Sequence, residues 1–136
     1  MTFTQIGETR IKNLTPHAIT IIGMDGVSRV FPSSGVNVRI DTIRGLPSAT
    51  VGDVEIPLFG ADTFGDVVLI DNTTKKMISK MSDIPESEGQ LFIVSGMAGA
   101  VLRDRSDVFV PMTAPSDKPV RNEKGHIVAV RGLKRP

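Results

Sequence analysis

Residues 91–110 read LFIVSGMAGAVLRDRSDVFV, and this stretch decides the fold. Residues 91–94 form a continuous apolar run, which is typical of a strand buried on both faces. Ser95 suits the N-cap position, and residues 96–103 predict one short helix that ends near residue 104. Residues 107–110 then predict a further strand. The stretch therefore indicates two strands joined by a helix of about two turns.

Strand patterns extend outward from this stretch in both directions. Alternating apolar and polar residues predict strands over residues 10–14, 17–24, 27–31, 36–40, 54–59 and 67–70. Asp25-Gly26 lies between two of these runs and is a strong hairpin signal. Residues 120–130 predict a second hairpin, closed around Asn122-Glu123-Lys124-Gly125. The proline-rich residues 111–119 predict an extended loop.

Composition points to the same fold class. The chain has 136 residues, a length typical of one domain, and we expect a single domain over residues 1–136. Its 13 Gly and 9 Pro are spread along the whole chain, which leaves no room for long helices. We therefore expect a mainly β (α+β) fold, with antiparallel sheets and one short helix over one face.

Composition also excludes several function classes. The chain has no Cys, which removes disulfides, thiolate nucleophiles and zinc sites built on Cys. It has no Trp or Tyr and six Phe, which disfavours DNA or RNA binding by base stacking. No apolar run reaches the roughly 18 residues of a membrane helix, and residues 1–10 do not have the pattern expected of a signal peptide. We expect a cytoplasmic protein without a membrane partner.

Catalytic or metal-binding patterns are missing. Ser95-Gly96-Met97-Ala98-Gly99 lacks the Gly two places before Ser of a nucleophile elbow and the Gly-Lys-Ser/Thr tail of a phosphate loop. The strand-to-helix junction still offers N–H groups to an anion, although it is also an ordinary junction. We expect His17 to begin a strand and His126 to be solvated, and we expect neither enzymatic activity nor a cofactor or metal.

Arginines are the remaining candidates. Residues 103–136 hold eight basic and four acidic residues, which fits either a solvated edge or a site for a small phosphate-bearing anion. Arg39, Arg103, Arg105 and Arg121 suit bidentate phosphate binding. Arg103 and Arg105 have Asp104 and Asp107 nearby, so local ion pairing is the alternative for both. Convergence of these side chains in space would favour a site.

Several motifs occur in order along nearly the whole chain. They are NLTPHAI at residues 13–19, FPSSG at residues 31–35 followed by Arg39, IVS at residues 93–95, Arg105 with Asp107, Pro111, Ala114-Pro115, and RNEKGHI at residues 121–127. In this order they resemble a family of small proteins common in phages and prophages. We identify that family with the first type of Thoeris anti-defence protein.

The resemblance implies a sponge and not an enzyme. Proteins of this kind bind cyclic ADP-ribose isomers made by bacterial TIR-domain proteins, and so silence the defence signal. They are homo-oligomers with ligand pockets between protomers, and some have separate sites for cyclic oligonucleotides. By likeness the ligand-binding residues here would be Arg39, Phe92, Ser95, Arg103, Arg105, Thr113 and Arg121. The arginines would hold phosphates and Phe92 would stack on adenine.

Some features depart from the family pattern and leave alternatives open. Residues 1–12 form an N-terminal extension, the middle of the chain is long and Gly-rich, and Met112 replaces an expected polar residue. A structural or protein-binding phage module is the alternative function, and it would expose an apolar patch instead of an Arg-lined pocket. Residues 91–102 carry no charge, which independently favours self-association.

Overall fold

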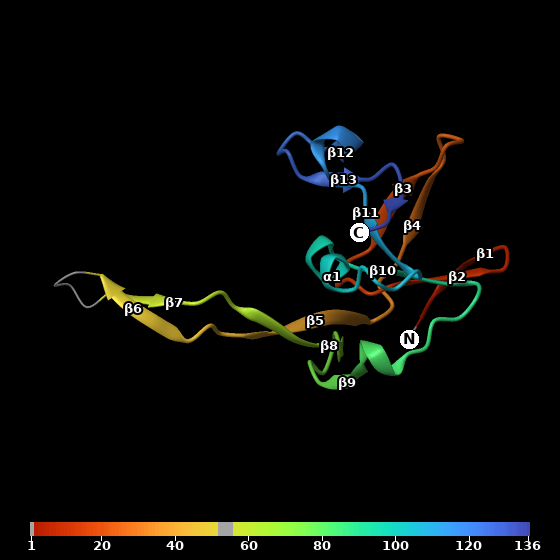
Figure 1. Cartoon of the computed structure of the whole chain (residues 1–136). Helices are drawn as coiled ribbons and strands as arrows, with labels where there is room; N and C mark the ends of the chain where they lie inside the picture. Colours follow the sequence, from red (N-terminus) through yellow and green to blue (C-terminus); the bar gives the residue numbers. More distant parts are fainter. Residues whose placement is uncertain (1, 52–55) are drawn as a thin grey trace.

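A mixed five-stranded sheet forms the centre of the protein, as the computed structural model shows (Figure 1). The structure describes residues 2–51 and 56–136. Strand β10 (Gln90–Ile93) lies between β2 (Thr9–Asn13) and β11 (Val108–Pro111) and runs parallel to both. Strands β1 (Thr4–Ile6) and β14 (Leu133–Lys134) complete the sheet in antiparallel pairings.

The predicted strand–helix–strand unit is confirmed around β10. Ser95 is the N-cap of α1 (Gly96–Val101), and its hydroxyl accepts a hydrogen bond from the Ala98 amide at 3.4 Å. Most strand pairs in the molecule are antiparallel, as expected, but the two central pairs are parallel. A parallel return needs a dozen or more residues, and both connections have them: residues 94–107, which include α1, join β10 to β11, and residues 14–89 join β2 to β10.

Two hairpins lie above this sheet in Figure 1. The first pairs β3 (Ile19–Ile22) with β4 (Ser28–Phe31), and Gly26 at φ +77° forms its predicted Asp-Gly turn. The second pairs β12 (Val120–Arg121) with β13 (Ile127–Ala129), also as predicted. The amide of Ile22 donates to the Val130 carbonyl at 2.8 Å, which joins the two hairpins side by side.

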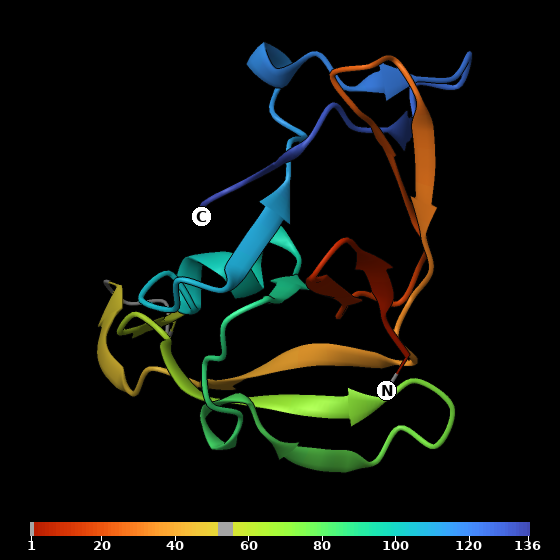
Figure 2. The same cartoon turned by 90° about the vertical axis from the view of Figure 1, so that its right-hand side faces the viewer.

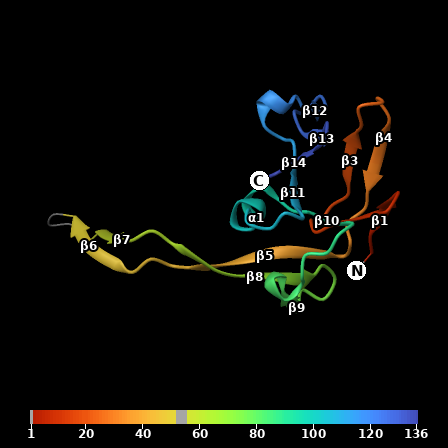
Figure 3. The ribbon, with the colours of Figure 1, turned by 45° about the vertical axis from the view of Figure 1, so that its right-hand side comes forward.

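A second layer lies below the central sheet and is continued by a long projection (Figures 1 and 3). Strand β8 (Thr63–Asp71) pairs with β5 (Val36–Ile43) and with β9 (Met77–Lys80). The ribbon of β5 and β8 leads into β6 (Pro47–Val51) and β7 (Ile56–Phe59). We call the described residues 41–51 and 56–66 the arm.

The arm departs from the sequence expectations in extent. The predicted strands at 36–40 and 67–70 are several residues longer, and β6 and β9 were not predicted at all. The predicted strand at 54–59 is seen as β7, with residues 54 and 55 outside the described residues. No strand was predicted around Gly45 and Pro47 in the Gly-rich middle, yet cross-strand pairing continues past them with a register shift.

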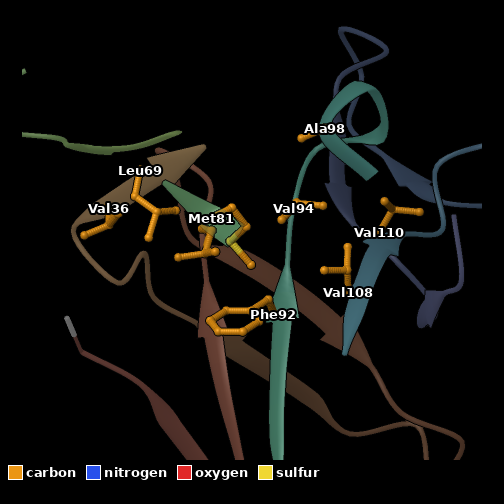
Figure 4. Packing of buried hydrophobic residues seen from close by; sticks show 9 residues of the cluster. Val36, Leu69, Met81, Phe92, Val94, Ala98, Val108 and Val110 are labelled. Carbon is orange, nitrogen blue, oxygen red and sulfur yellow. The ribbon is translucent and has the colours of Figure 1, made fainter. Parts of the chain in front are cut away.

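The core lies between the central sheet and the second layer. Phe92 and Val94 from the β10 segment meet Leu69 of β8 and Met81, while Val108 and Val110 of β11 pack beside α1 (Figure 4). Met81 begins the short η1 (Met81–Asp83), which no sequence pattern predicted. The expected loop at 111–119 likewise contains one turn, η2 (Pro115–Asp117). Figure 2 shows β5, β8 and β9 side by side below the central sheet.

α1 is the only α-helix among the described residues, and it has six residues. Within this part of the chain, no helix has the length and apolar character needed to span a bilayer.

Candidate functional site

The NLTPH motif holds two parts of the fold together. Asn13 is buried, and its Nδ2 donates to the carbonyls of His17 and Phe31, both at 2.9 Å. Its Oδ1 accepts from the amide and the hydroxyl of Thr15, at 3.0 and 2.6 Å. All the hydrogen bonds fix the end of β2 against the β3–β4 hairpin, so this motif shapes the fold. His17 precedes β3 with an exposed side chain, which fits its expected place at a strand start.

The FPSSG motif has a similar role. Ser33 Oγ donates to the Thr15 carbonyl at 2.7 Å and accepts from the Gly35 amide and from Asn72 Nδ2. Gly35 has φ +86°, a conformation that L side chains rarely adopt. The motif therefore joins the first hairpin to the second layer through backbone geometry and the half-buried Ser33 hydroxyl.

Arg105 is a structural residue. Its guanidinium forms two hydrogen bonds with the Asp107 carboxylate, at 3.0 and 2.9 Å, and Nη1 donates to the carbonyls of Met81 and Ile84. The Arg105 and Asp107 side chains are 16% and 4% exposed. Four of five N–H donors are thus used inside the chain. Local ion pairing is confirmed, and it leaves one N–H donor of Arg105 for a ligand, so a phosphate contact by Arg105 stays a prediction that its internal bonds disfavour.

Phe92 is also unavailable to a ligand. Its side chain is 0% exposed, at the centre of the core cluster, with Arg105 on one side at 5.9 Å from the ring centroid. A base could stack on this ring only if the core opened. The expectation that Phe92 stacks on adenine is therefore wrong for this fold. Its burial follows from its place on a central strand that is covered on both faces, where Ile93 and Val94 are fully buried as well.

Arg121 is held in place but exposed. It begins the turn of the β12–β13 hairpin, and its Nη1 donates to the Gly125 carbonyl at 2.7 Å. Asn122 Oδ1 accepts from the amides of Lys124 and His126, which fixes the turn. The remaining guanidinium donors of Arg121 face solvent in an ordered setting. His126 is exposed in the same turn, as expected.

Arg39 and Arg103 are exposed at other places on the molecule. Arg39 lies on β5, where its Nε is 3.5 Å from an Asp41 carboxylate oxygen. Arg103 follows α1, and its carbonyl accepts a hydrogen bond from Arg135. The β5 layer and the β12–β13 hairpin lie on opposite sides of the central sheet (Figures 1 and 2). Within one chain, Arg39 and Arg121 therefore do not converge.

Thr113 lines a hollow beside the hairpin that carries Arg121. The hollow has a volume of about 170 Å³, and apolar side chains surround it, including Ile19, Ile127 and Val128. Arg121 is the register partner of Ile127 on the neighbouring strand. An apolar hollow with a hydroxyl and a nearby guanidinium has the general character of a small-ligand site.

A larger hollow of about 440 Å³ lies between β8, η1 and the end of α1. Its polar lining includes Asp66, Ser82, Asp104 and Arg105. Arg105 is neutralised by Asp107, so the carboxylates dominate and a pyrophosphate is disfavoured there. Sequence reasoning missed this hollow because its walls come from three segments that are distant in the chain.

Four carboxylates have lowered pKa values, and each accepts hydrogen bonds. The Arg29 guanidinium lowers the pKa of Asp25, and the amides of Thr74 and Thr73 lower that of Asp71. The Ser106 hydroxyl lowers the pKa of Glu86, and the Lys134 ammonium lowers that of Asp117. These groups are ionised acceptors at neutral pH, which suits structural roles and not proton donation.

Among residues 2–51 and 56–136, no three His, Asp or Glu side chains are grouped closely enough to hold a metal ion. No protein-family description, curated protein or solved structure matches the chain.

Proposed function

We propose that the protein is a non-catalytic sponge for a cyclic ADP-ribose-type signal made by TIR-domain defence proteins. The order of sequence motifs motivates this function. The observation that supports it in the structure is the exposed guanidinium of Arg121, held by the Gly125 carbonyl at 2.7 Å. A guanidinium that is already ordered loses little entropy when it binds a phosphate.

Phosphate binding would need two copies of the chain. Arg39 and Arg121 lie on opposite sides of one molecule, so a pyrophosphate can reach both only at a contact between copies. Arg103 is exposed and could add a third cation. This arrangement accounts for arginines that are suited to phosphate but lie far apart in the single chain.

The adenine would bind the apolar hollow beside Arg121, instead of stacking on Phe92. Ile127 and Val128 supply apolar contacts, and the Thr113 hydroxyl can donate to or accept from the base. Ser95 already uses its hydroxyl as an N-cap, and its place in the ligand site is the weakest of the set.

Calorimetry with purified cyclic ADP-ribose isomers tests the proposal. Removing a hydrogen bond to a charged group costs about 1.5–3 kcal/mol, so Arg39→Ala or Arg121→Ala should weaken binding roughly ten- to a hundred-fold. Arg121→Lys should weaken binding by less than Arg121→Ala does. Lysine keeps the positive charge but loses the planar pair of donors with which a guanidinium binds a phosphate. Arg44→Ala, which removes an arginine packed on Phe59 in the arm, is the matched control and should bind normally.

Recovery of the ligand separates binding from catalysis. The complex is denatured and the ligand identified by chromatography, and an intact cyclic nucleotide is expected. Absence of binding by the wild type, or release of a hydrolysed product, would overturn the sponge. Unchanged binding by both arginine variants would show that other residues hold the phosphates.

A protein-binding phage module is the second candidate, and the exposed apolar side chains of the arm favour it. Leu46, Val51 and Leu58 are exposed on the arm, and Leu46 reaches 81%. Apolar groups collected on one projection are typical of an interaction surface. This candidate gains support if no cyclic nucleotide binds at submillimolar concentration to protein that is folded.

A further inference from the structure

The outer part of the arm is an amphipathic two-stranded ribbon. Ala49 pairs with Leu58 and Val51 pairs with Ile56, and residues paired across antiparallel strands share a face. Thr50 pairs with Pro57 on the opposite face. One face is therefore built of aliphatic side chains, and the other carries the Thr50 hydroxyl and the Pro57 ring.

The aliphatic face has no cover within the described chain. Val51, Ile56 and Leu58 are 49%, 52% and 45% exposed. Apart from Gly45 and Gly65, every described residue of the arm is exposed. An isolated two-stranded ribbon is marginally stable in water, so this one needs a surface to pack on.

We propose that the arm of one copy packs its aliphatic face against the N-terminal hairpins of a second copy, which are the β1–β2 and β3–β4 pairs. The acceptor is an apolar hollow of about 260 Å³ between β1 and the β3–β4 hairpin, lined by Ile6, Ile21, Gly23, Arg29 and Phe31. Ile6 lies at this hollow and is 47% exposed. The contact is head-to-tail, because arm and acceptor are different surfaces.

The arm cannot reach this hollow in its own chain. The arm and the N-terminal hairpins project from opposite sides of the molecule, in both Figure 1 and Figure 3. A second copy supplies the same arm in an orientation that the first cannot adopt. Each copy then offers one arm and one acceptor, so the contact can repeat.

Charge selects this acceptor over a second arm. Residues 41–66 hold five acidic residues and one basic residue, so two arms side by side would repel. Residues 1–40 hold four basic and two acidic residues, which leaves a net positive charge beside the acceptor, although Arg29 in the hollow is itself paired with Asp25 at 3.1 Å. Opposite net charge favours the encounter and its orientation, while the aliphatic face supplies the buried area.

The C-terminal region, residues 103–136, is basic as well, but its hollows match the aliphatic face of the ribbon less well than the acceptor does. One hollow there is smaller than the acceptor, about 170 Å³, with Thr20 and Thr113 in its lining. The other, about 400 Å³, is lined by polar turn residues, which do not match an aliphatic face: Asn122, Glu123, Lys124 and His126. The inference goes beyond the proposed function, since the assembly can form whether or not a nucleotide binds near Arg121.

Cross-complementation between two variants tests the contact. Leu58→Asp places a charge on the aliphatic face of the arm, and Ile6→Asp places one at the acceptor. Each variant alone should be a monomer of 14.6 kDa by light scattering at micromolar concentration, while the wild type is larger. An equimolar mixture should form a heterodimer, because an intact arm then meets an intact acceptor.

Matched controls carry the same charge on the opposite faces. Thr50→Asp alters the hydroxyl face of the same ribbon, and Gln5→Asp alters the neighbouring position of β1. Both should associate as the wild type does. A monomeric wild type, association that survives Leu58→Asp, or loss of association in Thr50→Asp would overturn the proposal.

The Ile6→Asp variant also tests two other surfaces that the arm could contact in a second copy, namely a second arm and the C-terminal region. If two arms pack together, the Ile6→Asp variant remains associated, which contradicts the proposal. The Ile6→Asp variant also remains associated if the acceptor is the C-terminal region, residues 103–136, and this outcome contradicts the proposal too. A photo-crosslinking residue at position 58 gives a second reading that does not depend on a folded aspartate variant. It should label residues 6–31 of another copy, and labelling confined to residues 41–66 or 103–136 would contradict the assignment.

Discussion

β10 and the arm are built from similar residues but have opposite surroundings. Phe92 and Ile93 of β10 are fully buried between neighbouring strands, α1 and the second layer. On the arm, Val51 pairs with Ile56 and Leu58 pairs with Ala49, and all three large side chains are exposed. Strand formation therefore follows from local pattern in both regions, whereas burial depends on what the rest of the chain brings alongside.

The difference separates two functions of apolar residues in this chain. Those of β10 complete a core that is closed within one molecule. Those of the arm contribute little to that core, because none of them belongs to its buried clusters. We call the described residues outside the arm the body. We infer that the body folds without the arm, and that the arm's apolar residues act between molecules.

Phenylalanine substitutions give the largest expected contrast. Phe92→Ala should lower the free energy of unfolding by about 3–5 kcal/mol, since it empties a packed site. Phe59→Ala on the arm should change it by less than about 0.5 kcal/mol, because the ring is exposed and loses only its contact with Arg44. Urea unfolding in dilute solution measures both. Similar losses in the two variants would contradict the division into core and arm.

Arginine substitutions test the same division for polar contacts. Arg105→Ala should destabilise the body by about 3 kcal/mol, since it leaves the Asp107 carboxylate buried without its partner. Arg121→Ala should cost less than about 0.5 kcal/mol, because its single internal bond is at the surface.

A double-mutant cycle with Asp107→Ala completes this prediction. Removing both partners should recover part of the lost stability, since no uncompensated charge remains. If Arg121→Ala were as destabilising as Arg105→Ala, Arg121 would be structural too, and its proposed place in a ligand site would lose support.

Sequence patterns predicted the parts of the fold that are held by local geometry. The Asp25-Gly26 turn, the Asn122–Gly125 turn and the segment from β10 through α1 to β11 all depend on residues close in the chain. β6 was missed because its turn-forming residues resemble a loop, and its pairing with β7 spans about ten residues. The parallel pairing of β2 with β10 joins residues about 80 apart, which no local pattern specifies.

The site expectations divide along the same line. Phe92 and Arg105 matched a chemical pattern, but tertiary packing uses both inside the core. Whether a residue faces a ligand depends on neighbours from distant segments, and a single sequence does not report them. The motifs that carry the family resemblance, such as Asn13 and Ser33, mostly fix turns and junctions. The resemblance therefore concerns fold-determining residues more than ligand contacts.

Acid should weaken the body through its structural carboxylates. The folded pKa values of Asp71, Glu86 and Asp117 lie below their ordinary values, 3.8 for Asp and 4.5 for Glu. Their contribution to stability is complete above these ordinary values and is lost as the pH falls through the lower, folded values. Thermal melts between pH 7 and pH 3 should show a falling melting temperature below about pH 4.5, and Asp71→Asn with Glu86→Gln should flatten that fall. A melting temperature independent of pH in the wild type would contradict the roles assigned to these groups.

Removal of the outer part of the arm should have little effect on the stability of the rest of the molecule. Gly45 and Gly60 lie against each other at the base of β6 and β7, where an added Cβ on Gly45 would come within 2.0 Å of the Gly60 carbonyl oxygen. The two backbones are thus close enough for an Asn-Gly turn to replace residues 46–59. The free energy of unfolding should change by less than about 1 kcal/mol in urea, because the deleted side chains are exposed and the new connection is short. The same variant should be monomeric, since the aliphatic face has gone. A large loss of stability would mean that the arm packs on its own body, and retained association would place the contact between copies elsewhere on the surface.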